Sequence, residues 1–371
     1  MPLGESEQKP NPRLAYLCLN RTLEGQGSYA HVNEIAEGLR NLGWKVVMFE
    51  PAYARSPVPA HSLWRLWEFI RVQVRLIRRL HTFDALYVRS HVAALPTMLW
   101  AHARGIPVVQ EVNSTHESIF LSFPRIRYLR PLVNWSLAAQ LSRAEALIAV
   151  TPALKTWLIR KIGHRNIHVV PNGANLTLFS PNAACSRSLP KNYVVFFGLL
   201  ATWQGLDVLL QALDSLEWPA DVSVVLMGDG PERFRVEEGA ARDSRVVYLG
   251  VVPYEEVGGI VARSLASISL KRAAHAEASP LKLYETLACA VPAVVSDQPG
   301  QADVVRTERC GMVVPDGDET KVAQAVAYLY RCPEQRRAMG ERGLAFVRRE
   351  GSWEWRAKQT DDVLRAVLDS R

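Results

Sequence analysis

The sequence predicts an α/β protein built from two doubly wound parallel-sheet domains. Short apolar runs, typical of buried strands, alternate along the whole chain with longer segments of helical periodicity. Turns rich in glycine and proline separate them, and the pattern fills two halves of about 180 residues. Ligands of such sheets bind at the carboxyl ends of the strands, so we expect the functional site to lie between the two halves.

Length and composition narrow the class of protein. The 371 residues suggest two or three domains, and a hydrophobic content of 48% is enough for complete cores. The polar residues 1–12 are expected to form a disordered tail rather than a signal peptide, and no apolar run reaches transmembrane length. No pair of cysteines has metal-binding or redox spacing, which favours a reducing cytoplasm; they are Cys18, Cys185, Cys289, Cys310 and Cys332.

Charge is distributed unevenly along the chain. Residues 1–180 hold 21 Lys and Arg against 11 Asp and Glu, whereas the remainder holds 23 against 26. The N-terminal half is therefore expected to meet an anionic partner. Nucleic acid and anionic lipid both qualify, but the sequence has no recognisable nucleic-acid-reading module, and we expect no nucleic-acid partner.

The first half opens with a βαβ unit: a strand over 13–20, a helix over 29–42 and a strand over 45–50. Gly25-x-Gly27-x-x-Ala30, with Glu50 ending the second strand, fits the dinucleotide-binding fingerprint. An NAD-dependent oxidoreductase is therefore one alternative. The pattern continues with strands over 85–88, 106–112, 146–150 and 167–170 and helices over 92–104 and 152–162.

Residues 61–81 are expected to form a basic amphipathic helix. We expect its apolar face to pack inward and its arginines to approach the headgroups of an anionic membrane. An ordinary domain helix with solvated arginines is the alternative. The apolar face is Leu63, Leu66, Trp67, Ile70, Val74 and Ile77; the other face carries Trp64, Arg71, Arg75, Arg78 and Arg79.

The second half repeats the alternation. Strands are expected over 193–197, 222–227, 246–249, 265–270, 293–295 and 313–314. Three helices close the chain, over 320–330, 334–349 and 353–368.

The segment 119–131 of the first half, with large apolar residues and three arginines, is a candidate flap over an acceptor or a membrane, or a plain surface loop.

The stretch from Glu277 to Glu285 is the strongest candidate site. Ser279 is suited to the N-cap, and Pro280 to the first position, of a helix that should run to about Ala290. Lys282 lies in the first turn, where the helix dipole disfavours a cation unless an anion binds there. Two carboxylates then flank a positive spot of phosphate size, as a sugar nucleotide would require. A solvated helix with a Lys282–Glu285 surface pair is the alternative.

Two glutamates separated by seven residues, followed by the text SPLKLYETLACAVPAVVSD, resemble the donor-site signature of retaining glycosyltransferase family 4. The resemblance covers nearly the whole chain after residue 12. It implies the GT-B fold, in which two Rossmann-like domains face a deep cleft. It also implies transfer of a sugar, with retention, from a nucleotide diphosphate sugar to a hydroxyl of a glycan or lipid-linked acceptor. No metal and no cofactor is implied, and the sequence has no Asp-x-Asp motif.

The resemblance also implies roles for individual residues. Glu277 would contact the donor sugar, Glu285 the nucleotide ribose, and Lys282 the leaving diphosphate. Asn113 stands where many members carry a histidine near the transferred sugar, with His116 as the other candidate. Further donor contacts are implied for Gly27, Gly198, Gln204, Ser279, Pro280 and Leu281.

Other positions also depart from the family pattern, which usually has arginine at Leu199, lysine at Gln204 and glycine at Ala290. The first two departures remove positive charge from the expected phosphate site. A non-catalytic sugar-nucleotide-binding partner in polysaccharide assembly is therefore a second alternative. Lys271, Arg272 and His275 are candidates to replace the missing charge.

The implied organisation places the protein in the cytoplasm or at the cytoplasmic face of a membrane. Its parts are a tail (1–12), an acceptor-side domain (13–180), a linker (181–192), a nucleotide-sugar-binding domain (193–350) and a terminal helix that crosses back to the first domain (351–371).

Overall fold

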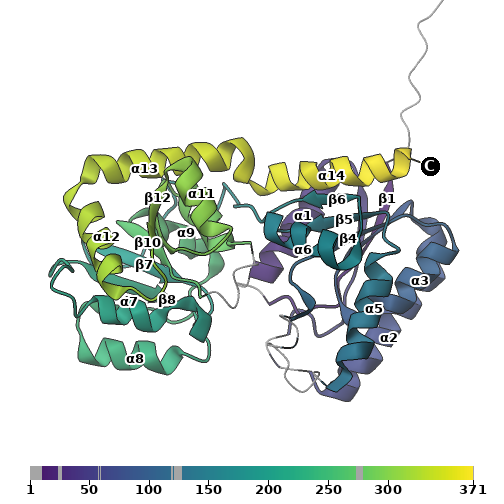
Figure 1. The fold of residues 1–371 in the computed structure, drawn as a ribbon, viewed down its shortest axis with the longest axis horizontal. Helices are drawn as coiled ribbons and strands as arrows, with labels where there is room; N and C mark the ends of the chain where they lie inside the picture. Colours follow the sequence, from purple (N-terminus) through teal and green to yellow (C-terminus); the bar gives the residue numbers. More distant parts are fainter. Residues whose placement is uncertain are drawn as a thin grey trace, which may run out of the picture.

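The computed structural model describes residues 11–23, 27–56, 58, 60–117, 120, 128–272 and 279–370. Two six-stranded sheets form its framework, and every strand pair in them is parallel (Figure 1). The predicted fold class is thus confirmed. Parallel strands need crossover helices on both faces of a sheet, which is why strands and helices alternate along the sequence.

The first sheet has the strand order β2-β1-β3-β4-β5-β6, and the second has the order β12-β11-β10-β7-β8-β9. The winding direction reverses between β1 and β3 and between β7 and β10, and these two points are where ligands of such sheets bind. The first six strands are β1 (Arg13–Leu17), β2 (Lys45–Phe49), β3 (Ala85–Arg89), β4 (Val108–Val112), β5 (Ala146–Ala149) and β6 (Ile167–Val169). The others are β7 (Tyr193–Phe197), β8 (Ser223–Met227), β9 (Val246–Tyr248), β10 (Ala266–Ser269), β11 (Ala293–Ser296) and β12 (Gly311–Val314).

Helices cover both faces of the first sheet. One core joins the sheet to α2 (Ser62–Arg79), α3 (Leu95–Ala103), α5 (Arg130–Leu141) and α6 (Pro152–Ile162). The core on the other face joins it to α1 (Gly27–Asn41) and α14 (Trp353–Asp369). Helix α5 was missed by the sequence analysis, because Pro131 in its first turn ends the preceding apolar segment as readily as it begins a helix.

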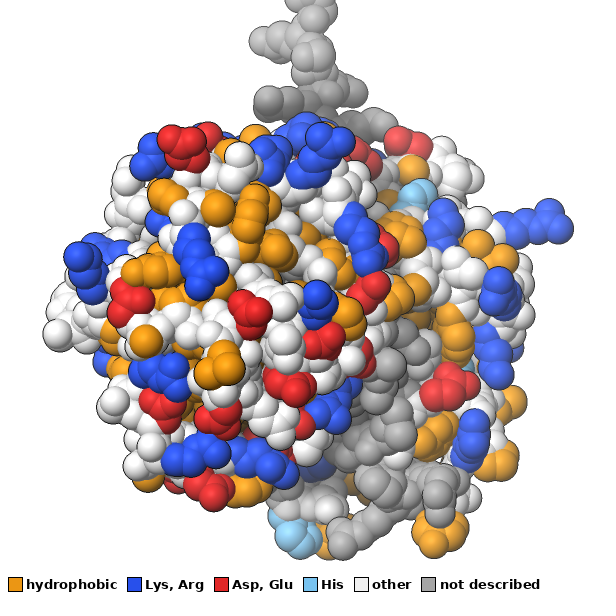
Figure 2. All heavy atoms as spheres, turned by 60° about the vertical axis from the view of Figure 1, so that its left-hand side comes forward, with side chains coloured by type: hydrophobic (Ala, Val, Ile, Leu, Met, Phe, Trp, Pro, Cys, Tyr) orange, Lys and Arg blue, Asp and Glu red, His pale blue; other side chains and the backbone are white. Residues whose placement is uncertain are grey.

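The second sheet is covered in the same way. One face packs against α7 (Leu206–Ala212), α8 (Arg233–Arg242) and α12 (Glu319–Arg331). The other packs against α9 (Tyr254–Ala262), α10 (Leu281–Ala288), α11 (Gln301–Glu308) and α13 (Pro333–Phe346). Positive and negative side chains are interspersed on this half of the molecule (Figure 2), in keeping with the near balance of its charges.

Helix α14 follows the second domain in sequence but packs on the first (Figure 1). A π-helical turn, Val347–Gly351, separates it from α13. Trp353 is buried in the core between α1 and the first sheet, whereas Trp355 is half exposed. The packing is close: a Cβ placed on Gly38 of α1 would lie 2.3 Å from the Cβ of Ala357.

The predicted orientation of α2 is wrong. The helix forms where expected, but its inward side carries Glu68, Val72, Gln73 and Leu76. The inward polar groups are satisfied: the Glu68 carboxylate accepts a hydrogen bond from the backbone N–H of Ala52 (2.7 Å) and the Gln73 amide oxygen accepts one from the Thr97 hydroxyl (2.9 Å). Because these bonds fix the rotation of the helix, most of the predicted apolar face points to solvent: Leu63, Leu66, Trp67, Ile70 and Val74.

Ala290, which follows α10, is one of two non-glycine residues with positive φ (56°) in the described part of the chain. A residue with a Cβ is disfavoured in this left-handed region by about 1–2 kcal/mol, so Ala290→Gly should raise the free energy of unfolding by about 1 kcal/mol. Denaturant unfolding of the whole chain tests this. Ala288→Gly, within α10, is the control and should lower stability by a similar amount. A loss of stability in both variants would contradict the prediction.

Candidate functional site

The first turn of α10 lies beside the switch point of the second sheet. The side chain of Lys282 runs over Gly198, the first residue after β7, so that a Cβ placed on Gly198 would lie 3.4 Å from Lys282 Cδ. Gly198 has φ +113°, a conformation that suits glycine. Lys271 follows β10, the other strand at the switch point. The structure thus places two lysines where the fold expects a ligand.

Lys282 is held from two sides. Its ammonium group lies 4.1 Å from the centre of the Phe196 ring and donates a hydrogen bond to the amide oxygen of Gln204 (2.8 Å). Burial, together with the nearby charge of Lys271, lowers the pKa of Lys282 to about 7. Burial also lowers the pKa of Lys271 to about 8. An anion bound here would favour the charged form of both groups.

Gln204 therefore has a defined place in the site. It ends a short 3-10 turn, Thr202–Gln204, between β7 and α7, and its amide oxygen accepts a hydrogen bond from Lys282. A lysine at position 204 would repel Lys282, whereas the neutral glutamine orients it. Leu199, where the family usually has arginine, is 44% exposed.

Glu285 lies one turn further along α10 and is 2% exposed. Its carboxylate accepts a hydrogen bond from the hydroxyl of Tyr254 on α9 (2.5 Å). Burial raises the pKa of Glu285 to about 7, against the opposing effect of this hydrogen bond. The alternative of an exposed Lys282–Glu285 pair is wrong, because the two side chains are directed to different partners, Gln204 and Tyr254.

The start of α10 also meets the first domain. A Cβ on Gly27, at the start of α1, would lie 2.9 Å from Leu281 Cδ2, so a glycine permits the two helix ends to approach. Ser279 does not cap α10 as predicted: Pro280 is the N-cap residue, and no side chain caps the helix. The Ser279 hydroxyl instead accepts a hydrogen bond from the backbone N–H of Asn172 (2.9 Å), across the domain boundary.

Some predicted residues lie outside the described residues: Glu277, His275, Gly25 and most of the 119–131 segment. Of the other basic candidates, Arg272 forms an ion pair with Asp207 at the start of α7, so its charge is partly compensated. Lys271 is the remaining candidate close to Lys282.

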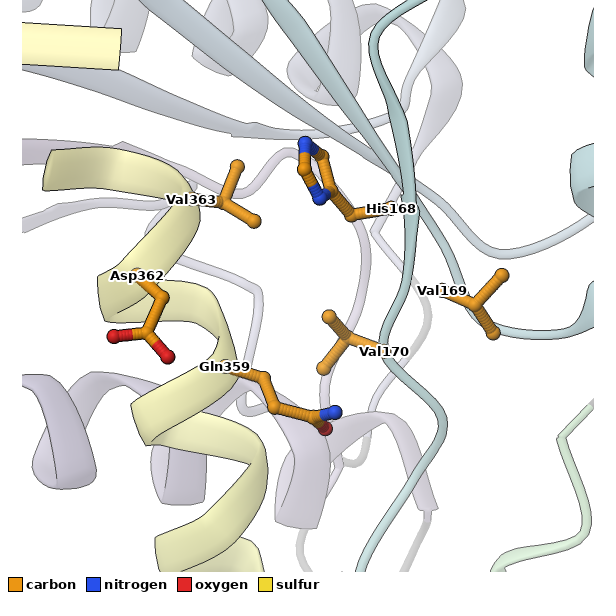
Figure 3. Close-up of a pocket in the computed structure, with 6 residues that line it drawn as sticks. All are labelled: His168, Val169, Val170, Gln359, Asp362 and Val363. Atoms are coloured by element: carbon orange, nitrogen blue, oxygen red, sulfur yellow. The ribbon is translucent and has the colours of Figure 1, made fainter. Parts of the chain in front are cut away.

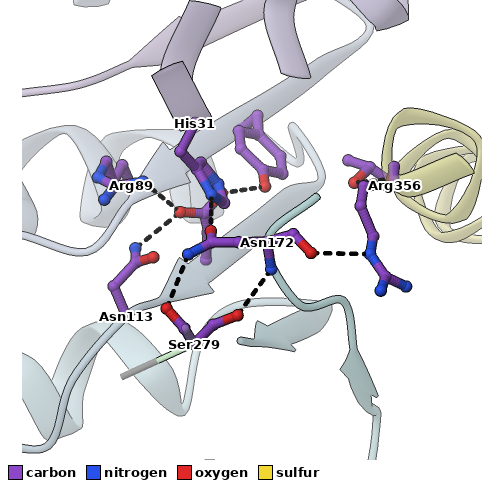
Figure 4. A network of polar contacts seen from close by, with 9 residues as sticks. His31, Arg89, Asn113, Asn172, Ser279 and Arg356 are labelled. Atoms are coloured by element: carbon purple, nitrogen blue, oxygen red, sulfur yellow. Dashed lines mark hydrogen bonds and ion pairs between the residues drawn. The ribbon is translucent and has the colours of Figure 1, made fainter. Parts of the chain in front are cut away.

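A buried carboxylate, Glu111, organises the facing edge of the first sheet (Figure 4). Its oxygens accept hydrogen bonds from Arg89 (2.7 Å), Tyr87 (2.6 Å) and Asn113 (2.7 Å), and one lies 2.7 Å from His31 Nε2. Burial alone would raise the pKa of Glu111, but the charges of His31 and Arg89 hold it well below its ordinary value.

Asn172 connects this cluster to the second domain and to α14 (Figure 4). Its side-chain oxygen lies 2.7 Å from His31 Nδ1, and its side-chain nitrogen donates to the backbone oxygen of Ser279 (3.0 Å). Its backbone oxygen accepts a hydrogen bond from Arg356 on α14 (3.1 Å). A continuous polar chain therefore runs from the end of β4 to the start of α10.

Asn113 and His116, the two candidates for the residue near the transferred sugar, lie in different surroundings. Asn113 joins the Glu111 cluster. His116 packs edge-on against Trp157 of α6, with a ring-centre distance of 4.9 Å, and burial lowers its pKa. His91 caps the short turn before α3, as its Nδ1 accepts a hydrogen bond from the Ala93 N–H (3.2 Å). The geometry therefore favours Asn113 over His116 as the residue near α10.

Four residues that shape the site were not predicted from the sequence: Glu34, Glu111, Tyr254 and Asn172. Glu34, on α1, accepts a hydrogen bond from the Asn175 side chain (2.7 Å), and its charge acts on both Glu285 and Tyr254. Asn172 belongs to the Pro171-Asn172-Gly173 turn motif, whereas no motif marks the other three. Glu111 could have been noticed as a charged residue in a mainly apolar strand segment.

A pocket of about 280 Å³ lies elsewhere, between β6 and α14 (Figure 3). His168 lines it, but the ring nitrogen Nε2 of this histidine already bonds to Asn166 (2.8 Å). The pocket is a packing gap beside the crossing helix rather than part of the α10 site. Within the described residues, no group of three His, Cys, Asp or Glu side chains is placed to hold a metal ion.

Two family models match the chain, one in each half. Residues 26–178 match glycosyltransferase family 4, and residues 186–345 match glycosyl transferases group 1. A phosphatidyl-myo-inositol mannosyltransferase of Mycobacterium leprae is 28% identical over 93% of this chain and 94% of its own length. An alpha-maltose-1-phosphate synthase of Mycolicibacterium smegmatis is 25% identical over 63% of this chain and 66% of its own.

Solved structures share the fold of this chain. Sucrose-phosphate synthase from Thermosynechococcus elongatus superposes with a TM-score of 0.78 at 18% identity, covering 97% of this chain and all of that one. Anabaena Alr3699/HepE in complex with UDP gives 0.74 at 16% identity, covering 95% of this chain and all of that one. The chain is thus a family 4-like glycosyltransferase with the GT-B fold.

Proposed function

We propose that this GT-B glycosyltransferase moves a sugar, with retention of anomeric configuration, from a nucleotide diphosphate sugar to a hydroxyl group of a glycan or lipid-linked acceptor. The observation that carries the proposal is the position of Lys282. It stands in the first turn of α10, anchored by Gln204 and close to Lys271, at the switch point of the second sheet. Two partly buried lysines, whose pKa values are lowered by desolvation, form a site that an anion would stabilise.

In this proposal the donor diphosphate lies between β7, β10 and the start of α10. Lys282 stabilises the negative charge that develops as the bond to the sugar breaks. Gln204 and Gly198 position Lys282, while Ser279, Pro280 and Leu281 hold the start of the helix against the first domain. The leaving phosphate accepts the proton of the attacking hydroxyl. No carboxylate base, metal or cofactor is then required, and Glu277 contacts the donor sugar.

We propose that the acceptor binds at the carboxyl ends of the strands of the first sheet, where Asn113 follows β4. Hydrogen bonds through Asn172 and Ser279 connect this region to the start of α10. The similar Mycobacterium leprae protein is named for mannosyl transfer to phosphatidyl-myo-inositol, which supports a lipid-linked hydroxyl here. We propose that the enzyme works in the cytoplasm or at the cytoplasmic face of a membrane, in the synthesis of a surface polysaccharide or glycolipid.

A thermal-shift screen tests the donor site. UDP, GDP and their sugar conjugates should raise the melting temperature, and NAD should not. A shift with NAD alone would favour the oxidoreductase alternative, which rests on the segment around Gly27. A melting-temperature shift with nucleotide sugars, but neither transfer nor donor hydrolysis, would favour the non-catalytic partner. That alternative was suggested by the missing positive charge at Leu199 and Gln204.

Glu285→Ala should weaken binding of the nucleotide by about 10–100-fold, since a buried carboxylate that accepts hydrogen bonds from the ribose hydroxyls would be lost. Titration calorimetry with the nucleoside diphosphate measures the change. Glu255→Ala, an acidic residue in the first turn of α9, is the control and should leave affinity unchanged. Equal affinity of Glu285→Ala and the unmutated protein would remove Glu285 from the donor site.

A further inference from the structure

Three neighbouring helices of the first domain, α2, α3 and α5, expose a large number of apolar side chains. They lie together on the side of the first sheet opposite α14 (Figure 1). The exposed residues are Leu63, Trp64, Leu66, Trp67, Ile70 and Val74 on α2, Leu99 and Trp100 on α3, and Tyr128, Leu129, Leu132 and Trp135 at and within the start of α5. We call this set the three-helix face. Soluble proteins rarely expose so many large apolar groups in one region without a partner.

The exposed side of α2 is divided lengthwise. At 100° per residue, Leu66, Ile70 and Trp67 lie on one flank and the exposed arginines lie on the other. Gln73, at the edge of the apolar flank, bonds to Thr97 of α3 (2.9 Å). The apolar flank of α2 therefore continues toward α3, and α5 packs on α3 in turn.

The exposed charges on these helices are all positive. Glu68 is their sole acidic residue, and it is 1% exposed and paired with Arg71. Two tryptophans carry an arginine above the ring: Arg71 lies 5.4 Å from the ring centre of Trp67, and Arg104 lies 4.7 Å from that of Trp100. Seven arginines on or next to these helices are exposed: Arg65, Arg71, Arg75, Arg78, Arg79, Arg104 and Arg130.

We propose that the three-helix face binds the surface of a lipid bilayer that contains anionic lipids. Tryptophan and leucine side chains would enter the boundary between headgroups and acyl chains, while the arginines contact lipid phosphates. A second copy of the chain is a poorer occupant, because a two-fold contact would place arginine-bearing surfaces against each other. Among the residues that the structure describes, the helices lack the length and hydropathy of a membrane-spanning segment. The proposal does not depend on the donor site.

Vesicle sedimentation of the full chain tests the proposal, with phosphatidylcholine vesicles and with vesicles that also contain about 30% phosphatidylglycerol. The unmutated protein should bind the mixed vesicles more tightly. The triple variant Leu66→Ser, Trp67→Ser, Ile70→Ser should lower the partition coefficient at least about 100-fold. Arg78→Gln with Arg79→Gln should lower it about 30-fold on the mixed vesicles and little on phosphatidylcholine alone.

Matched controls come from the second domain. Leu216→Ser with Phe234→Ser removes two exposed apolar side chains, and Arg331→Gln with Arg337→Gln removes two exposed arginines; both variants should bind vesicles normally. The nucleotide-induced rise in melting temperature should persist in the triple variant, which separates this proposal from the donor site. Absence of vesicle binding by the unmutated protein would overturn it. So would a concentration-dependent dimer, without vesicle binding, that the triple variant abolishes.

Discussion

Lys282→Met should lower kcat/KM for sugar transfer by about 10²–10³, the range seen when one group that stabilises transition-state charge is removed. Methionine keeps the apolar stem that packs over Gly198 but removes the ammonium group, which lies over the Phe196 ring. The loss should appear in kcat as well as in KM, because charge on the leaving diphosphate increases as the bond breaks. Steady-state kinetics with the donor identified by the thermal-shift screen measure both.

A matched control exists on the same domain. Lys321 of α12 also bonds to a glutamine, Gln324 (2.9 Å), but on the exposed surface. Lys321→Met should leave kinetics unchanged. The folded protein should tolerate Lys282→Met without loss of thermal stability, since a lysine of depressed pKa gains little from its own charge in the absence of ligand. Normal kinetics in Lys282→Met would refute the site.

The same lysine makes donor binding depend on pH. Its pKa of about 7 in the free protein means that raising the pH through 7 removes the proton that the diphosphate attracts. Affinity for the nucleotide sugar should therefore fall between about pH 6 and pH 9 and be accompanied by proton uptake. In Lys282→Met this dependence should be weaker and centred near pH 8, the pKa of Lys271. Calorimetry in buffers of different ionisation enthalpy counts the protons.

Glu111→Gln should destabilise the protein by about 3–5 kcal/mol, because it leaves the Arg89 guanidinium buried without its charge partner. Arg89 is 9% exposed, so water cannot replace the lost carboxylate. Denaturant unfolding measures the change. Glu37→Gln breaks an exposed pair with Arg40 on α1 and should cost less than about 1 kcal/mol. Similar losses in both variants would contradict the special role of the buried cluster.

The pH dependence of stability provides a second test of Glu111. Its folded-state pKa is depressed, so its contribution is complete above the ordinary carboxylate value of 4.5 and is lost as the pH falls toward the folded value. Acid should therefore destabilise the unmutated protein more than Glu111→Gln below about pH 4.5. A parallel loss in both proteins would show that other carboxylates dominate.

The fold could be predicted from local patterns because each parallel strand is a short apolar run with a turn at each end. Tyr193–Phe197 and Pro152–Ile162 match the predicted limits residue for residue. The rotation of α2 could not be predicted, since Glu68 and Gln73 point inward only because Ala52 and Thr97 supply their hydrogen-bond partners. A helical wheel contains no information about such distant groups.

The site was only partly predictable for the same reason. Lys282 and Glu285 belong to one helix, and their spacing is visible in the sequence. Their partners Gln204 and Tyr254 come from other elements, and the cluster around Glu111 draws on two strands, α1 and the segment that holds Asn172. The significance of Gln204 in particular follows from its hydrogen bond to Lys282, which only the three-dimensional arrangement reveals.

The return of α14 to the first domain has a consequence for biosynthesis. Residues 353–369 are translated at least about 180 residues after every strand of the first sheet, yet they cover one face of that sheet. Until then, apolar side chains around α1 remain open to water and to chaperones. We therefore expect nascent chains stalled before residue 353 to be retained by chaperones, and to be released once α14 has been made.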